Sequence, residues 1–245
     1  MGLLDKVKLE KILLARQVGR FLSSDKASAG DASEKDAVTK AAITLASDKS
    51  SAVREVLAYE LRQCQSLARE LIENIAADIE SISVPFLLES PALTDEEMGR
   101  LVPKIQDYAC AALASRPDLG PVTILAIAEN GGQLSVTRLL RNDRITLDGV
   151  TVHMVMTRFE EETWMMDQMG VRTDIEPELM GRLKTIMSQT GRLAVVAIHE
   201  GRTLEAGSIA QIAAEKAAAL AKPRKAAAPA GLAGENKAPQ HIEVA

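Results

Sequence analysis

Apolar residues recur along this chain at spacings of three and four, which is the period of an α-helix. The helix formers alanine, leucine, glutamate and methionine dominate, and runs rich in valine, isoleucine and tyrosine are scarce. Short exceptions such as residues 150–159, VTVHMVMTRF, stand between helical patterns and follow Asp148-Gly149, which favours a helix there too. The pattern predicts an all-α protein.

The stretch 84–98, VPFLLESPALTDEEM, predicts a helix, a tight turn and a second helix. Pro85 fits the first turn of a helix, where its missing N–H breaks no hydrogen bond. The residue before Pro91 is forced out of the helical region, so the first helix ends there. Thr94 and Glu97 have the spacing of a capping box, which begins the second helix.

Three apolar ladders run along the chain with a period of 26 residues. They consist of Leu67, Leu93, Leu119, Ile145 and Val171; of Leu61, Leu87, Leu113, Leu139 and Met165; and of Ala76, Val102, Ala128, Met154 and Met180. The turn sequences SPAL, RPDL and NDRI share one phase of this period. A unit of this length holds two helices of about ten residues, and stacked units bury the faces that a single hairpin exposes. The pattern predicts an α-solenoid of short helical hairpins with repeats of about 26 residues, covering roughly 51–189.

The two ends of the chain depart from this period. Residues 1–22 predict an amphipathic helix with a basic side, and 23–36 a polar linker or loop. The helical repeat domain is expected over 37–207, a C-terminal helix over 208–222 and a disordered tail over 223–245. The N-terminal helix is interpreted as a cover for the open end of the solenoid; weak contact with a membrane surface or a partner groove is the alternative.

Segments 50–61, 78–98 and 112–143 carry a resemblance in their elements V-x-x-x-L-L-E-S-P-x-L and R-P-D-L. They resemble the alphaproteobacterial family known as domain of unknown function 2336, over about residues 45–207. The resemblance implies a HEAT-like helical repeat fold and implies no activity. The chain departs from the family pattern after Arg158, where the R-P-x-L turn is missing.

Composition narrows the surroundings and partners of the protein. Of 245 residues 47% are hydrophobic, which is ample for a core, and no apolar run is long enough to cross a bilayer. A cytoplasmic location is expected, with Cys64 and Cys110 as reduced, buried thiols. The net charge of −5 argues against stable nucleic-acid binding, although a local basic patch remains compatible with it.

No catalytic motif, metal site or cofactor site is predicted. Phosphate-binding loops, C-x-x-C pairs and H-E-x-x-H are absent from the sequence. His153 falls on a ladder phase otherwise filled by aliphatic residues, which indicates a core or edge position, and His199 stands beside Glu200 in the terminal region. The acidic run 160–162 is interpreted as the solvated start of a helix.

The candidate binding residues come from one phase of the period and from charge. One residue in each predicted repeat stands three positions before the apolar residue of the first ladder. These residues are Cys64, Ser90, Arg116, Asn142 and Gln168. We predict a partner-binding surface made of Arg116, Arg138, Arg141, Asn142, Arg144 and Trp164, suited to an acidic or phosphorylated protein. The alternative is that these side chains bind the carbonyl groups that end each first helix.

Three classes of function fit the sequence. A non-catalytic scaffold or regulatory adaptor that binds another protein is favoured by the predicted solenoid and by the missing motifs. A nucleic-acid-binding or repair protein, similar to HEAT-like DNA glycosylases, is the first alternative, and a basic surface with an exposed tryptophan would favour it. An enzyme for a small molecule is the second, and a deep pocket with convergent polar groups would favour that.

Overall fold

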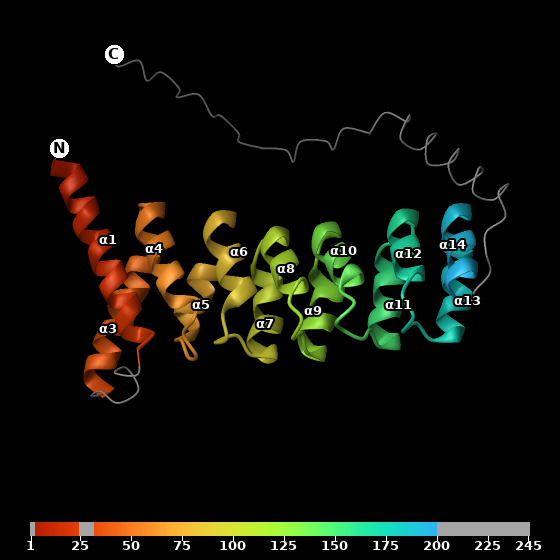
Figure 1. Cartoon of the computed structure of the whole chain (residues 1–245), viewed down its shortest axis with the longest axis horizontal. Helices are drawn as coiled ribbons and strands as arrows, with labels where there is room; N and C mark the ends of the chain where they lie inside the picture. The colour runs from red at the N-terminus through yellow and green to blue at the C-terminus, as the bar shows by residue number, and fades with distance from the viewer. Residues whose placement is uncertain (1–2, 25–31, 200–245) are drawn as a thin grey trace, which may run out of the picture. The chain divides into compact units, whose positions relative to one another are not determined.

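The computed structural model describes residues 3–24 and 32–199, and every regular element within these ranges is a helix (Figure 1). The all-α prediction is therefore confirmed. The helices are α1 Leu3–Leu22, α3 Ala32–Ala46, α4 Ser51–Leu61, α5 Arg69–Ala76, α6 Glu80–Glu89, α7 Asp95–Leu101, η1 Val102–Lys104, α8 Asp107–Ala114, α9 Pro121–Asn130, α10 Gln133–Arg141, α11 Gly149–Arg158, α12 Thr163–Gly170, α13 Pro177–Ile186 and α14 Gln189–His199. The predicted C-terminal helix and tail, 208–245, lie outside the described residues.

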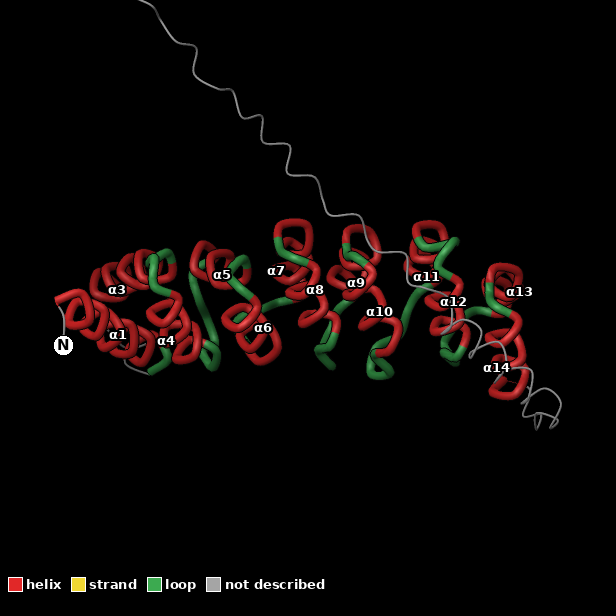
Figure 2. Tube along the Cα trace, turned by 90° about the horizontal axis from the view of Figure 1, so that it is seen from above, coloured by secondary structure: helices red, strands yellow, loops and turns green. Residues whose placement is uncertain are grey.

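The described helices alternate between two rows (Figure 2). One row contains α1, α4, α6, α8, α10, α12 and α14, and each of these helices packs against the next in its row. The other row contains α3, α5, α7, α9, α11 and α13, with α3 packed on α5 and with α7, α9, α11 and α13 packed in succession. The connection between one pair of successive helices therefore lies beside the connection that follows it by about 26 residues.

The core lies between the two rows and follows the apolar ladders. The ladder of Leu61, Leu87, Leu113, Leu139 and Met165 is completely buried at all five positions. Leu93, Leu119 and Ile145 of the first ladder are buried and Leu67 is half-buried, but Val171 is 41% exposed. The prediction that Val171 plugs the core is wrong, because Ile175, four residues later, is buried in that region.

The joint between α6 and α7 largely follows its sequence prediction. Thr94 accepts a hydrogen bond from the Glu97 N–H, and the Glu97 carboxylate accepts one from the Thr94 N–H, so the capping box is present. α6 ends at Glu89, with Ser90 as its C-cap. Pro85, however, lies inside α6 and not in its first turn, since the helix already begins at Glu80. The apolar run extends the helix on the N-terminal side of the proline.

Two further predictions concern the limits of helices. Residues 150–159 form a helix, α11, whose N-cap Asp148 accepts a hydrogen bond from the Thr151 N–H. The linker predicted at 23–36 is shorter than expected, because α3 begins at Ala32. α1 packs against both α3 and α4. Within the described residues, none of the helices is both long and apolar enough to span a membrane.

Candidate functional site

Arg116 lies just after the end of α8, and its side chain is only 6% exposed. Its guanidinium group donates hydrogen bonds to the carbonyl oxygens of Leu87, at 3.0 Å, and Ser90, at 3.1 Å. It also forms a two-point ion pair with Asp118 at 2.8 and 2.9 Å, and this hydrogen-bonded pairing lowers the pKa of the Asp118 carboxyl group. Carbonyls at a helix end have no partner inside the helix. Arg116 therefore closes the C-terminal end of α6.

Asn142 performs the same task one helix further along the row. Its side-chain amide donates to the carbonyl oxygens of Ala114, at 3.0 Å, and Arg116, at 2.7 Å, at the end of α8. The predicted placement of Arg116 in an exposed basic patch is thus wrong, because its donors are used inside the fold. The contacts of both side chains agree with the alternative that they bind helix-ending carbonyls.

Arg172 makes a third joint of this kind, which the sequence analysis missed. It donates to the carbonyl oxygens of Leu140, Asn142 and Ile145 at 3.1, 2.8 and 2.7 Å, and it pairs with Asp174 at 2.6 and 2.8 Å. Burial disfavours the charged form of Asp174, but the hydrogen bonds from Arg172 and from the Leu147 N–H outweigh burial and lower its pKa. Both joints have the pattern R-x-D, at 116–118 and 172–174, but the same pattern at 141–143 contains the exposed Arg141.

Aspartates at the start of two helices form a second kind of tie within the rows. The Asp95 carboxylate, on α7, accepts hydrogen bonds from the N–H groups of Val122 and Thr123 at 3.0 and 2.9 Å, at the start of α9. The Asp107 carboxylate, on α8, likewise accepts from the N–H groups of Gly132 and Leu134 at 2.9 and 3.0 Å, at the start of α10. Each aspartate thus caps the next helix of its own row.

Glycine is required where these carboxylates approach the backbone. A Cβ atom on Gly132 would lie 2.4 Å from a carboxylate oxygen of Asp107, and one on Gly120 would lie 2.2 Å from Asp95. Real Cβ contacts are longer than 3.0 Å. The glycines therefore leave space for the cap, and the joints between helices are built from pairs of residues that are far apart in sequence.

Three of the exposed arginines lie close together in sequence, at the end of α10 and in the loop after it. We call Arg138, Arg141 and Arg144 the arginine surface; all three are exposed, the first two on α10 and the third in the loop that follows. Arg141 donates from Nε to the side-chain oxygen of Gln168 at 3.0 Å. Across residues 3–24 and 32–199, the structure gives no hydrogen-bond or ion-pair partner to the side chains of Arg138 and Arg144.

A groove with a volume of about 500 Å³ lies beside the arginine surface. We call it the central groove. The loop between α10 and α11 and the region from α12 to α13 form its two sides, with Arg141, Asp143, Thr146, Gln168, Val171 and Thr173 among its lining residues. The lining combines cationic, hydroxyl, amide and aliphatic groups, which suits an extended peptide better than a wholly apolar ligand.

Trp164 lies on α12, the neighbour of α10 in the row, and is 43% exposed. It stands 26 residues after Arg138, so the two residues occupy equivalent positions on adjacent helices. Its indole N–H donates to the Glu162 carboxylate at 2.8 Å, which holds the ring in place. Residues 160–162 precede α12 and line a separate groove of about 410 Å³, in agreement with their interpretation as a solvated helix start.

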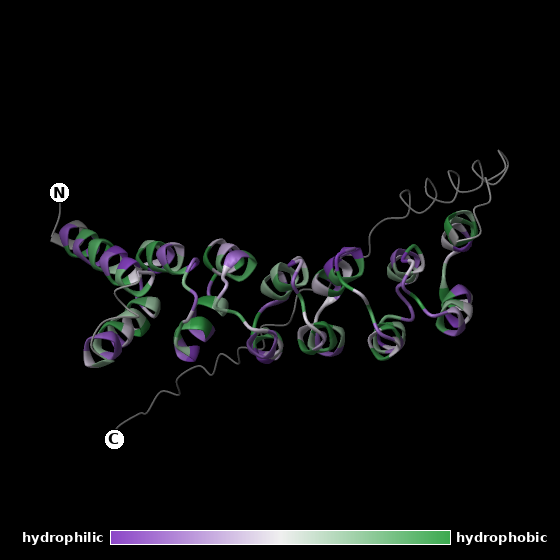
Figure 3. Cartoon of the chain, turned by 60° about the horizontal axis from the view of Figure 1, so that its bottom comes forward, coloured by the Kyte–Doolittle hydropathy of each residue, from purple (hydrophilic) through white to green (hydrophobic). Residues whose placement is uncertain are grey.

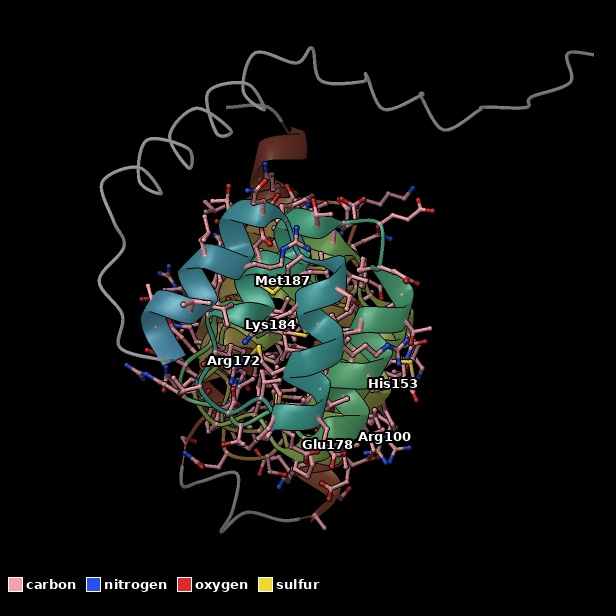
Figure 4. All side chains as sticks on the ribbon, turned by 90° about the vertical axis from the view of Figure 1, so that its right-hand side faces the viewer. Arg100, His153, Arg172, Glu178, Lys184 and Met187 are labelled. Carbon is pink, nitrogen blue, oxygen red and sulfur yellow. The ribbon has the colours of Figure 1, made fainter. Side chains whose placement is uncertain are left out.

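The cysteines and His153 are the remaining side chains that were considered for chemistry. Cys64 and Cys110 are free and buried, as predicted, and burial raises the pKa of both thiols, that of Cys110 to about 12. His153 is exposed at the edge, where its Nδ1 lies 3.0 Å from an Arg182 guanidinium nitrogen, and Figure 4 shows it well apart from Arg172. The described part of the chain contains no group of three or more His, Cys, Asp or Glu residues arranged to hold a metal ion. The side chain of His199 lies outside the described residues.

These features define an all-helical protein in which neighbouring helices of one row are tied by arginine and aspartate side chains, with further arginines on the surface. The chain belongs to the family described as an uncharacterised protein conserved in bacteria (DUF2336), which matches residues 82–241. The family inferred from the sequence is confirmed, although the match begins later and extends further than the expected 45–207. No curated protein and no solved structure matches the chain significantly.

Proposed function

We propose that this protein is a non-catalytic scaffold or regulatory adaptor of the bacterial cytoplasm, built as an α-solenoid of HEAT-like helical hairpins. The two rows of helices and the ties that recur between successive joints support a solenoid. Solenoids offer long binding surfaces along which each hairpin contributes a few side chains. The partner is another protein that presents an acidic or phosphorylated segment.

The observation that carries this proposal is the pair of surface arginines without partners, Arg138 and Arg144. Arg116 and Arg172 are instead used by the fold, whereas Arg69 and Arg100 are exposed elsewhere on the chain and serve as the comparison. Like charges placed close together destabilise a protein slightly, and folding alone does not require them. Arginine also binds carboxylates and phosphates through two parallel hydrogen bonds, which makes it well suited to such a partner.

The central groove and Trp164 extend the arginine surface. An acidic or phosphorylated residue would bind the guanidinium groups, while its flanking residues would enter the groove past Val171, which is 41% exposed. Trp164 would supply an aromatic anchor at the edge, since exposed tryptophan and arginine are enriched among residues that dominate binding energy. The surface thus combines charge for specificity with apolar area for affinity.

The test uses a double substitution, Arg138→Glu with Arg144→Glu, and an array of peptides that carry glutamate clusters or phosphoserine. Fluorescence anisotropy with the best-binding peptide should show binding at least tenfold weaker, about 1.4 kcal/mol, with an unchanged melting temperature. The matched control is Arg69→Glu with Arg100→Glu, which changes the charge equally at exposed arginines outside the arginine surface and should bind normally. Equal binding by both variants would place the interaction elsewhere.

Single-stranded nucleic acid is a second candidate ligand, and the exposed Trp164 on α12, which packs against the arginine-bearing helix α10, is the observation that favours it. A labelled oligonucleotide in the same assay separates the two. Binding to nucleic acid should weaken steeply with salt and should be reduced by Trp164→Ala through lost base stacking. Tight oligonucleotide binding together with no peptide binding would replace the scaffold proposal.

A further inference from the structure

The two halves of α1 have different surroundings. In the C-terminal half, Ala15 is fully buried and Val18 is 7% exposed, where α1 packs against its neighbours α3 and α4. In the N-terminal half, every residue from Lys6 to Leu14 is exposed except Ile12, which is half-buried. We call residues 6–14 the outer half of α1. Within the described chain only Ile12 packs against the core and only Lys11 is paired, so most of this half is open to solvent.

The outer half is strongly apolar for an exposed helix. Its exposed fractions are 47% for Val7, 45% for Leu9, 49% for Leu13 and 46% for Leu14. Single exposed aliphatic residues are common on proteins, but four within eight positions of one helix require an explanation. Figure 3 shows hydrophobic and hydrophilic segments alternating along this helix.

Basic side chains outnumber acidic ones in α1. α1 has five basic side chains, all between residues 6 and 20, and two acids, Asp5 and Glu10. Lys11 is paired with Asp48 at 2.6 Å, and Arg16 and Arg20 lie 3.5 and 3.4 Å from Glu60. Lys6 and Lys8 are exposed, and the structure gives their ammonium groups no acceptor among the residues it describes.

We propose that the outer half of α1 binds the surface of an anionic lipid bilayer. Leu9 and Leu13 are four positions apart and share one side of the helix, whereas Val7 and Leu14, seven apart, share another. A helix that binds a bilayer surface buries one apolar side at the boundary between lipid headgroups and acyl chains, and we assign this role to the side that contains Leu9 and Leu13. Lysine side chains extend along apolar surface and leave their ammonium groups among the anionic headgroups.

Charge also decides against a second copy of the chain as the occupant. Two outer halves packed together would bring Lys6 and Lys8 of both copies near one another, and Glu10 is the one acid within residues 6–14 of each copy. An anionic bilayer instead attracts every one of these lysines, and each basic residue near such a surface contributes binding energy. This inference is independent of the partner-binding role of the arginine surface.

The experiment is vesicle co-sedimentation of the full chain. Vesicles contain phosphatidylcholine and phosphatidylglycerol in equal amounts, or phosphatidylcholine alone. The protein should bind the anionic vesicles at least about tenfold more strongly than the neutral ones. Both Leu9→Ser with Leu13→Ser and Lys6→Gln with Lys8→Gln should lower binding about tenfold or more, because the first pair removes apolar contact and the second removes charge.

Matched controls are available on the same chain. Leu134→Ser with Val150→Ser removes two exposed apolar residues elsewhere, and Lys35→Gln with Lys49→Gln removes two exposed lysines; both should sediment as the wild type does. The variant Arg138→Glu with Arg144→Glu should also bind vesicles normally, because its substitutions lie outside α1. The vesicle experiment therefore tests membrane binding separately from the proposed scaffold function. All substituted side chains are exposed, and circular dichroism should show unchanged helix content.

Three outcomes would overturn the inference. The first is equal binding of the wild type to both vesicles, or no binding to either. The second is wild-type binding by the Leu9, Leu13 variant. The third is a dimer in light scattering that this variant dissociates while vesicles bind nothing, which would assign the outer half to a second copy.

Discussion

Arginines in the same part of the sequence differ in their surroundings: some are buried and hydrogen-bonded, and others are exposed. Arg116 and Arg172 have side chains that are 6% and 8% exposed, and each fixes the carbonyl groups at the end of a helix that precedes it by about one repeat. Arg138 and Arg144 are exposed and have no partner that the described structure shows. The difference shows that an arginine's role here depends on its place relative to a helix end, because R-x-D stands at both interior sites but also at 141–143, where Arg141 is exposed.

The interior arginines stabilise the fold through hydrogen bonds to groups that would otherwise be unsatisfied. A hydrogen bond to a charged group contributes about 1.5 to 3 kcal/mol, and a buried carbonyl left without a donor costs a similar amount. A surface arginine makes no such bond, so its removal should leave the free energy of unfolding nearly unchanged. Substitution of an interior arginine should therefore lower the stability of the fold, whereas substitution of a surface arginine should affect only binding.

The largest expected effect comes from Arg116→Ala. This change removes the donor for the Leu87 and Ser90 carbonyls and the partner of Asp118, and should lower the free energy of unfolding by about 3 kcal/mol. Urea unfolding followed by circular dichroism measures it. Arg116→Lys should lose an intermediate amount, because one ammonium group cannot reproduce the guanidinium geometry.

Arg138→Ala is the matched control for that experiment, and it should change the free energy of unfolding by less than about 0.5 kcal/mol. If both alanine variants have the same urea midpoint, the contacts of Arg116 contribute nothing to stability. The distinction between interior and surface arginines would then be lost.

Much of the fold was predictable from apolar spacing alone. The ladder from Leu61 to Met165 is fully buried because each member occupies the inward side of its helix, and inward sides recur with the helical period. The errors arose at element limits. Pro85 lies inside α6 because apolar packing of Ile82 and Phe86 extends the helix across it. Val171 is exposed at the C-cap of α12, and Ile175 is buried in that region.

The candidate site was predictable only in part. Charge and position indicated Arg138, Arg141, Arg144 and Trp164, and the structure leaves all four exposed. Sequence alone could not separate them from Arg116, since burial depends on which carbonyls lie within reach. The Asp95 and Asp107 caps were missed because their partners stand 25 to 28 residues away and are brought near only by packing within the rows.

A smaller effect is expected for Gly132→Ala. The new Cβ would lie 2.4 Å from the Asp107 carboxylate and displace it from the start of α10. Loss of a helix cap costs about 1 to 2 kcal/mol, and thermal or urea unfolding should show that decrease. This prediction extends the comparison from arginines to the second kind of tie between helices.

Gly181→Ala provides the control, because nothing lies within 4 Å of a Cβ atom added there. Alanine is a better helix former than glycine, so this variant of α13 should gain about 0.5 to 1 kcal/mol. Opposite signs for the two glycines would support the Asp107 cap. A stabilised Gly132→Ala variant would mean that the cap is unimportant.

The smallest effect concerns acid, and it separates charge from hydrogen bonding in the Arg172–Asp174 joint. The pKa of Asp174 is lowered in the folded protein, so the unfolded chain binds a proton more readily than the folded chain does. The stabilisation is therefore complete above the ordinary carboxyl pKa of about 4 and is lost as the pH falls through the lowered folded value.

Asp174→Asn keeps an oxygen acceptor but not the charge. Its urea midpoint should lie below that of the wild type at pH 7, and the gap should narrow below about pH 4. Asp143→Asn, at an exposed residue of the central groove, should show little gap at either pH. A gap for Asp174→Asn that stays constant with pH would mean that shape and hydrogen bonding, and not the carboxylate charge, hold Arg172 in place.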